Sequence, residues 1–233
     1  MQYNPHEYQK FCIDYLLERP AAGLFLKPGM GKTSVALTAA ERLLYDTFEA
    51  SKVLVIAPLR VAEDTWSRES AKWDHLQHLR VSRVLGSIKE RRAALRADAD
   101  IYCINRENVD WKAYGMNWPF DVVIIDELSS FRNPSARRFK ALRKVRPLVK
   151  YLWGLTGTPR PKSLLNLWAQ VYLLDRGERL GKTFTEYKRR YFNPGRRNGY
   201  VVYEWVPCDG AEDEIYARIG DICVSLETKG NVK

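Results

Sequence analysis

The sequence lacks the long apolar runs and the cysteine clusters that mark membrane, secreted and zinc-binding proteins. No apolar run approaches the roughly 20 residues that a membrane span needs, and the start, MQYNPHEYQK, lacks the basic and apolar blocks of a secretory signal. The four cysteines are far apart and form no C-x-x-C pair: Cys12, Cys103, Cys208 and Cys223. We therefore expect a cytoplasmic protein with reduced thiols, no membrane partner and no structural metal.

Acidic residues are missing from one long stretch of a chain whose net charge is +10. Between Leu128 and Leu174 there is no Asp or Glu. The basic residues of this stretch are Arg132, Arg137, Arg138, Lys140, Arg143, Lys144, Arg146, Lys150, Arg160 and Lys162. Such a cluster is either a solvated basic surface or a surface that binds a polyanion, and charge alone does not decide between them.

Short apolar runs rich in β-branched residues alternate with helical stretches. This alternation is typical of an α/β fold, a parallel sheet with crossover helices on both faces. The predicted strands are Gly23–Leu26, Val53–Ala57, Val81–Leu85, Ile101–Ile104, Val122–Ile125 and Tyr151–Leu155. Val53–Ala57 and Val122–Ile125 are apolar throughout, as expected for central strands. Apolar residues at helical spacing after Lys32 predict a crossover helix.

The chain changes character near its last quarter. We expect residues 1–175 to form one α/β lobe and residues 176–233 to form a basic, aromatic appendage. In the appendage, Tyr200–Val206 is predicted to be a strand, the second arm of a hairpin. Gly210–Leu226 is predicted to be a helix with its isoleucines on one face.

A glycine-rich loop, KPGMGKT, lies between the first predicted strand and the crossover helix. Backbone N–H groups of such a loop can surround the β- and γ-phosphates of a nucleotide at a helix N-terminus, where the helix dipole favours anions. Gly29 and Gly31 permit the tight turn, Lys32 can reach the phosphates, and the Thr33 hydroxyl can ligate Mg²⁺. The predicted nucleotide-binding residues of the loop are Lys27, Pro28, Gly29, Met30, Gly31, Lys32 and Thr33.

An acidic pair follows the strand Val122–Ile125, in the segment VVIIDE. The carboxylates of Asp126 and Glu127 are expected at the carboxyl edge of the sheet, beside the glycine-rich loop. We expect Asp126 to hold Mg²⁺ and Glu127 to orient or deprotonate the attacking water. With Lys32, they form a predicted catalytic site for ATP hydrolysis, and the expected cofactors are ATP and Mg²⁺.

With both sites placed, the chain resembles the first RecA-like lobe of superfamily 2 helicases, and among these the Snf2-like translocases of short phage or bacterial type. The loop at 27–33 is similar to motif I of that family, and IAPLRVAEDTW (56–66) is similar to motif Ia. DELSSFRNPSARRFKAL (126–142) resembles motif II with its basic extension, and GLTGTPRPKSLLNLW (154–168) resembles motif III with the helix after it. The resemblance covers about residues 3–192.

The resemblance implies roles for residues outside the two central motifs. HEYQ (6–9) is similar to the family's glutamine motif, which would place Gln9 against the adenine. Coupling of hydrolysis to DNA movement maps onto Thr156, Gly157 and Thr158. Motif II usually continues with Ala and His, but this chain has Leu128 and Ser129, so Ser129 would have to take over the coupling role of the His.

DNA contacts are predicted at two places. The resemblance implies contacts with the phosphate backbone at the sheet edge, by Pro58, Leu59, Arg60, Asn105 and Arg106. The basic stretch predicts further contacts by Arg137, Arg138 and Lys140. Trp66 and Trp73 are seven residues apart, and we expect them to pack in the core and not to stack on bases.

The sequence leads us to expect the ATP-binding lobe of a DNA-dependent ATPase that tracks along double-stranded DNA. One alternative is a strand-separating superfamily 2 helicase, which shares motifs I and II. Another is a non-hydrolysing nucleic-acid-binding module, against which the presence of Lys32 and Glu127 argues. The motifs of a second RecA-like lobe, with its arginine fingers, are not found, so we expect that lobe beyond Lys233 and weak ATPase activity from this chain alone.

Overall fold

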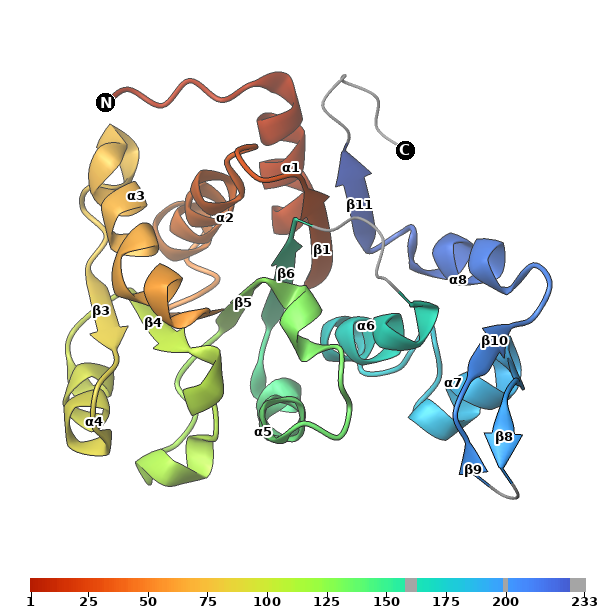
Figure 1. The fold of residues 1–233 in the computed structure, drawn as a ribbon. Coiled ribbons are helices and arrows are strands. Elements are labelled where there is room, and N and C mark those ends of the chain that lie inside the picture. The colour runs from red at the N-terminus through yellow and green to blue at the C-terminus, as the bar shows by residue number, and fades with distance from the viewer. Residues whose placement is uncertain (158–162, 199–200, 227–233) are drawn as a thin grey trace.

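The computed structural model describes residues 1–157, 163–198 and 201–226 of the chain. Its centre is a parallel sheet of seven strands in the order β11-β1-β6-β5-β2-β4-β3 (Figure 1). The strands are β1 (Ala21–Leu26), β2 (Val53–Ala57), β3 (Val81–Val84), β4 (Ile101–Asn105), β5 (Val122–Asp126), β6 (Tyr151–Thr156) and β11 (Cys223–Leu226). Every strand predicted for the first lobe is present, and the predicted α/β fold is confirmed.

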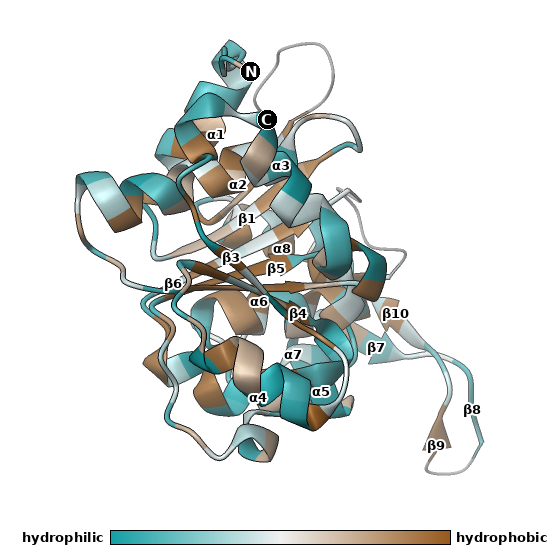
Figure 2. Ribbon diagram, turned by 90° about the vertical axis from the view of Figure 1, so that its left-hand side faces the viewer, coloured by the Kyte–Doolittle hydropathy of each residue, from teal (hydrophilic) through white to brown (hydrophobic). Residues whose placement is uncertain are grey.

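Helices cover both faces of the sheet (Figure 2). One face carries α1 (Glu7–Leu17), α2 (Lys32–Glu41) and α3 (Trp66–Lys72); the other carries α4 (Ile88–Arg96), α5 (Arg137–Val145), α6 (Leu167–Asp175) and α7 (Phe184–Tyr191). In β2, Val53 and Val55 pack on the first face, while Leu54 and Ile56 pack on the second. Because successive side chains point to opposite faces, a strand covered on both sides is apolar at every position.

The segment after α6 forms α7, a β-ribbon and α8 (Ala211–Ile219). The ribbon pairs β7 (Phe192–Pro194) with β10 (Trp205–Pro207) and β8 (Arg197–Asn198) with β9 (Val201–Val202), and it projects from the body of the protein (Figure 2). The predicted hairpin is therefore present.

The strand predicted at Tyr200–Val206 is interrupted. The carbonyl of Arg196 accepts from the N–H groups of both Tyr203 and Glu204, so two residues oppose one and a bulge separates β9 from β10. Tyr200 itself lies outside the described residues.

The prediction of one helix over Gly210–Leu226 is wrong in its second half. Helix α8 ends at Ile219, and β11 pairs in parallel with β1 at the border of the sheet. The fit depends on Gly23 of β1, because a Cβ atom there would lie 2.9 Å from the sulfur of Cys223. The spacing of the isoleucines fits one long helix and also a helix followed by a strand. The strand forms because the edge of β1 is available for pairing.

The division into residues 1–175 and 176–233 stays a prediction, but the hydrophobic core does not stop at that boundary. The sheet takes β11 from the second segment. One buried cluster contains Tyr187 and Ile215 together with Leu152 and Leu174. None of the helices within the described ranges has the length and apolar character needed to cross a bilayer.

Replacing the fully buried Ile215 with Ala should lower the free energy of unfolding by about 2–4 kcal/mol, because the cavity opens in the core that also supports the sheet. Urea denaturation followed by circular dichroism should show one transition that moves as a whole. Val201→Ala is the control: Val201 is 56% exposed, and its truncation should change stability by no more than about 0.5 kcal/mol. Two transitions, of which Ile215→Ala moves only one, would mean that the appendage folds independently.

Candidate active site

The carboxyl ends of three neighbouring strands bring the predicted site residues to one edge of the sheet. Strand β6 lies between β1 and β5, with Phe25 opposite Thr156 and Leu155 opposite Asp126. The glycine-rich loop follows β1, and the acidic pair closes β5. Because all three strands run in parallel, their ends meet at the same edge although the segments are far apart in sequence.

The glycine-rich loop has the geometry of an anion site. Gly29 and Gly31 have φ angles of 84° and 72°, a left-handed conformation that favours glycine. Gly31 is also crowded, since a Cβ atom there would lie 2.4 Å from Nε2 of Gln9. Lys32 begins α2, and its Nζ donates to the carbonyl oxygens of Leu26 at 2.8 Å and Lys27 at 3.2 Å. The loop therefore presents a lysine charge at a helix N-terminus.

Opposite charges face each other across this edge. Burial lowers the pKa of Lys32, and the nearby carboxylates of Asp126 and Glu127 oppose that shift. Burial raises the pKa of Asp126, and a hydrogen bond from Trp66 together with the charge of Lys32 opposes it. The lysine and both carboxylates thus lie within electrostatic reach of one another in a partly buried site.

The residues at this edge fit a magnesium ion. Mg²⁺ prefers oxygen ligands and is usually bound by one or two carboxylates together with substrate phosphates. Asp126 supplies a carboxylate at the end of β5, and Thr33 supplies a hydroxyl in the first turn of α2. That hydroxyl makes no hydrogen bond within the part of the chain that the structure describes, so it is available as a ligand.

One contact of the site was not predicted from sequence. Trp66 was expected to pack in the core, and it is fully buried there, which confirms the prediction. Its indole N–H also donates to Oδ2 of Asp126 at 3.1 Å. A buried indole needs an acceptor for its single donor, which could have indicated a polar partner, but the sequence does not say which one. Trp73 is half-buried and donates to Glu69 at 2.8 Å, away from this edge.

Glu127 leaves β5 in a left-handed conformation, with a φ of 66° that is rare for a residue other than glycine. Its Oε1 accepts hydrogen bonds from the hydroxyl of Ser129 and, at 3.2 Å, from that of Thr156. The structure therefore brings together two of the residues predicted for coupling, one from each of two motifs, on the predicted catalytic carboxylate.

The other motif III residues lie beside the loop. A Cβ atom at Gly157 would lie 3.4 Å from Cδ of Pro28, so the turn after β6 packs against the glycine-rich loop. Thr158, also predicted for coupling, lies outside the described residues. The unusual Leu128 is fully buried, and a Cβ atom at Gly154 would lie 2.5 Å from its Cδ2. Glycine at 154 therefore makes room for the large residue in motif II.

Gln9 lies against the loop, but its amide is already hydrogen-bonded. Its Oε1 accepts from the backbone N–H of His6 at 3.0 Å, and its Nε2 donates to the carbonyl of Met30 at 3.5 Å. The hydroxyl of Tyr8 donates to the same carbonyl at 3.4 Å, and the ring of His6 stacks on Tyr8. Gln9 and Tyr8 thus link α1 to the loop, and contact of Gln9 with an adenine stays a prediction.

The residues predicted to contact DNA lie farther along the same edge. Pro58, Leu59 and Arg60 follow β2, and Arg106 follows β4. These strands are neighbours, with Ala57 opposite Asn105. Leu59 and Arg60 are exposed, whereas Pro58, Asn105 and Arg106 are partly buried.

Ion pairs neutralise part of this surface. Arg138 pairs with Glu107 at 2.5 Å, and Arg137 pairs with Asp110 at 3.4 Å. Glu107 also lies 3.6 Å from Arg106. The stretch from 128 to 174 contains no acidic residues. Because α5 begins beside the loop after β4, the acidic residues of that loop pair with the arginines of α5.

Arg60 and Lys140 remain as exposed cations of the predicted DNA surface. Neither makes an ion pair within residues 1–157, 163–198 and 201–226. A cation without a carboxylate partner can contact a phosphate without first breaking an ion pair. These two residues are therefore better placed for phosphate contacts than Arg137 and Arg138.

Comparison with known proteins identifies the family of this chain. The model of the SNF2-related domain matches residues 8–223. Protein p41 of Acyrthosiphon pisum secondary endosymbiont phage 1 is 37% identical over 233 residues, which cover 97% of this chain and 51% of that protein. Helicase ssl-1 of Caenorhabditis elegans is 26% identical over 180 residues, which cover 72% of this chain and 7% of that protein.

A solved structure shares the fold. The Sulfolobus solfataricus SWI2/SNF2 ATPase core in complex with double-stranded DNA superposes with a TM-score of 0.78 at 22% identity. The superposition covers 97% of this chain and 45% of the Sulfolobus chain. This chain thus spans about half the length of the phage relative and of the Sulfolobus core. It belongs to the SNF2-related family, and its sheet is a RecA-like lobe of that family's ATPase core.

Proposed function

We propose that this chain is the ATP-hydrolysing lobe of a motor that moves along double-stranded DNA. The observation that carries the proposal is the meeting of Lys32, Asp126, Glu127 and Thr156 at one edge of the sheet. The Sulfolobus core, similar in fold over 97% of this chain, is described in complex with double-stranded DNA. That complex supports a duplex as the track.

The residues of the edge have separate tasks in this proposal. The N–H groups of the loop and the Nζ of Lys32 bind the phosphates. Thr33 and Asp126 hold Mg²⁺, which supplies positive charge against the phosphate oxygens. Glu127 orients the attacking water and accepts its proton. A module that only binds nucleic acid would have no need of Glu127 at this place.

ATP hydrolysis would be coupled to DNA movement through the two hydroxyls that donate to Glu127. In the structure, Oε1 of Glu127 accepts from both Ser129 and Thr156. Gly157, next to Thr156, packs on Pro28 of the loop. If Glu127 changed its hydrogen-bond partner during hydrolysis, Thr156 at the end of β6 would therefore lose a direct contact. In this proposal Ser129 takes the place of the usual histidine, because its hydroxyl donates to Glu127.

The complete motor needs more than this lobe. Phosphoryl-transfer enzymes of this class use arginine fingers that contribute about 10³–10⁵-fold in rate. The chain spans 51% of the phage relative and 45% of the Sulfolobus core. We propose that a second RecA-like lobe beyond Lys233 supplies the fingers, and that the isolated chain binds ATP but turns it over slowly.

Lys32→Ala should abolish measurable ATP binding by calorimetry, because it removes the charge that the loop presents. Glu127→Gln should still bind ATP but lower turnover by about 10²–10⁴-fold, since the water loses its proton acceptor. Lys89→Ala, an exposed lysine on α4, is the control and should match the parent in both assays. ATP binding by Lys32→Ala as tight as that of the parent would mean that the loop is not the nucleotide site.

Trp66→Phe should raise the Mg²⁺ concentration needed for ATP binding by about 10–100-fold. This is the usual loss of metal affinity when a hydrogen bond that orients a metal ligand is removed. The phenyl ring keeps an aromatic group in the core, although it is smaller, and it cannot donate to Asp126. Calorimetry at a series of Mg²⁺ concentrations measures the change. Trp73→Phe is a matched control, because its indole donates to Glu69, and it should leave the Mg²⁺ dependence unaltered. The same outcome for Trp66→Phe would show that the indole does not position Asp126.

Arg60→Ala with Lys140→Ala should lower the slope of log affinity against log salt on duplex DNA by about 1.8, at about 0.9 for each phosphate that is no longer neutralised. Arg137→Ala with Arg138→Ala should lower it less, because these arginines are already paired with Asp110 and Glu107. Binding to a fluorescent duplex at several salt concentrations gives the slopes. Equal slopes for the parent and the Arg60/Lys140 double variant would remove these residues from the DNA surface.

A further inference from the structure

A cavity lies at the opposite edge of the sheet from the candidate active site. Its volume is about 1010 Å³. It is bordered by Pro20 just before β1, by the segment that follows α6, and by Asp221 just before β11. The glycine-rich loop follows β1, whereas this cavity precedes it, so the two sites are at different ends of the same strand.

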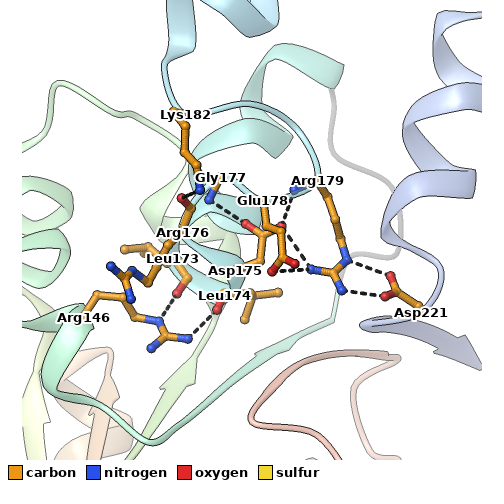
Figure 3. Close-up of polar contacts among 10 residues, drawn as sticks. All are labelled: Arg146, Leu173, Leu174, Asp175, Arg176, Gly177, Glu178, Arg179, Lys182 and Asp221. Carbon is orange, nitrogen blue, oxygen red and sulfur yellow. Dashed lines mark hydrogen bonds and ion pairs between the residues drawn. The ribbon is translucent and has the colours of Figure 1, made fainter.

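The carboxylates of the cavity are already engaged. Asp175 accepts from the backbone N–H groups of Gly177 and Arg179, each at 2.8 Å (Figure 3). The Arg179 guanidinium donates two hydrogen bonds to Asp221, at 2.8 and 2.5 Å. It also lies 3.4 Å from Asp175 and 3.6 Å from Glu178. Arg179 therefore contacts each of the three carboxylates in the cavity wall.

Three other cations of the wall have no carboxylate partner within the described ranges: Arg146, Arg176 and Lys182. Arg176 and Lys182 are exposed, and Nζ of Lys182 donates to the backbone carbonyl of Arg176, at 3.4 Å. The wall as a whole carries five cations against three carboxylates, so it has a net positive charge.

Arg146 is the buried member of the three, with 7% of its surface exposed. Its guanidinium donates to the backbone carbonyls of Leu173 at 2.6 Å and Leu174 at 2.5 Å (Figure 3), and also to that of Val149 at 3.0 Å. These bonds hold the group rigidly and use three of its five N–H donors. Burial and the nearby charge of Arg176 lower the pKa of Arg146 to about 10. The charge of Asp175 opposes this shift, but the hydrogen bonds of Arg146 go only to carbonyls within the described residues. A further anion would therefore stabilise the buried cation.

We propose that this cavity binds a phosphate group, with Arg146, Arg176 and Lys182 as its ligands. A fixed guanidinium with free N–H donors matches phosphate oxygens, and a flexible lysine adds a point charge. The cavity is large enough for a small phosphorylated molecule, and a nucleic-acid backbone carries the same group. The cavity is separate from the active site, and its binding of phosphate does not depend on the proposed ATPase function.

Pyrophosphate is the probe, titrated by calorimetry into the Lys32→Ala variant so that the glycine-rich loop does not contribute. Arg176→Gln and Lys182→Gln, added together, should weaken binding at least about 10-fold, since two of the three charges are removed. Both side chains are exposed, so the fold should be preserved. The control adds Lys89→Gln and Arg189→Gln, which remove the same charge from exposed positions elsewhere, and should bind like Lys32→Ala alone.

Two results would overturn the proposal. One is the absence of pyrophosphate binding by Lys32→Ala, and the other is equal binding by Lys32→Ala with and without the Arg176 and Lys182 substitutions. The source of the phosphate is decided by repeating the titrations with a mononucleotide and with a short duplex. Loss of mononucleotide binding indicates a small phosphorylated ligand. Loss of duplex affinity with a lower salt slope indicates a nucleic-acid backbone.

Discussion

Parallel pairing of β1, β6 and β5 is the constraint on which the rest of the candidate site depends. Because the three strands run in the same direction, their carboxyl ends meet at one edge. The glycine-rich loop, Thr156 and Asp126 therefore become neighbours. The same pairing puts the amino ends at the opposite edge, where the arginine-lined cavity lies. One sheet thus separates the candidate active site from the cavity proposed to bind phosphate.

Hydrogen bonds from neighbouring side chains position the two carboxylates of the candidate active site. The indole of Trp66 holds Asp126, and two hydroxyls hold Glu127. The departures from the family's usual motif II are accommodated in the same place. Ser129 reaches Glu127 directly, and Leu128 fills the space that Gly154 leaves on β6. The change to Leu128 is thus accommodated by the neighbouring strand β6, whereas Ser129 contacts Glu127 within its own motif.

Charge in this protein is organised by contacts between segments and not by the composition of any one segment. Arg137 and Arg138 come from a stretch without acids, yet the loop after β4 neutralises them. Arg146 comes from the same stretch and is buried against backbone carbonyls with no carboxylate partner in the described residues. Identical side chains from one basic run therefore differ in whether a carboxylate of the chain pairs with them within the described residues.

The sequence by itself determined the central strands, the glycine-rich loop and the acidic pair, because their patterns depend on local spacing and on burial from both faces. Tertiary structure decided the rest. Strand β11 formed where a helix was expected, since β1 offered an unpaired edge. The partners of Trp66, Gln9 and Arg138 also come from distant segments. Such contacts leave no spacing pattern in the chain, because they arise only when the sheet brings the segments together.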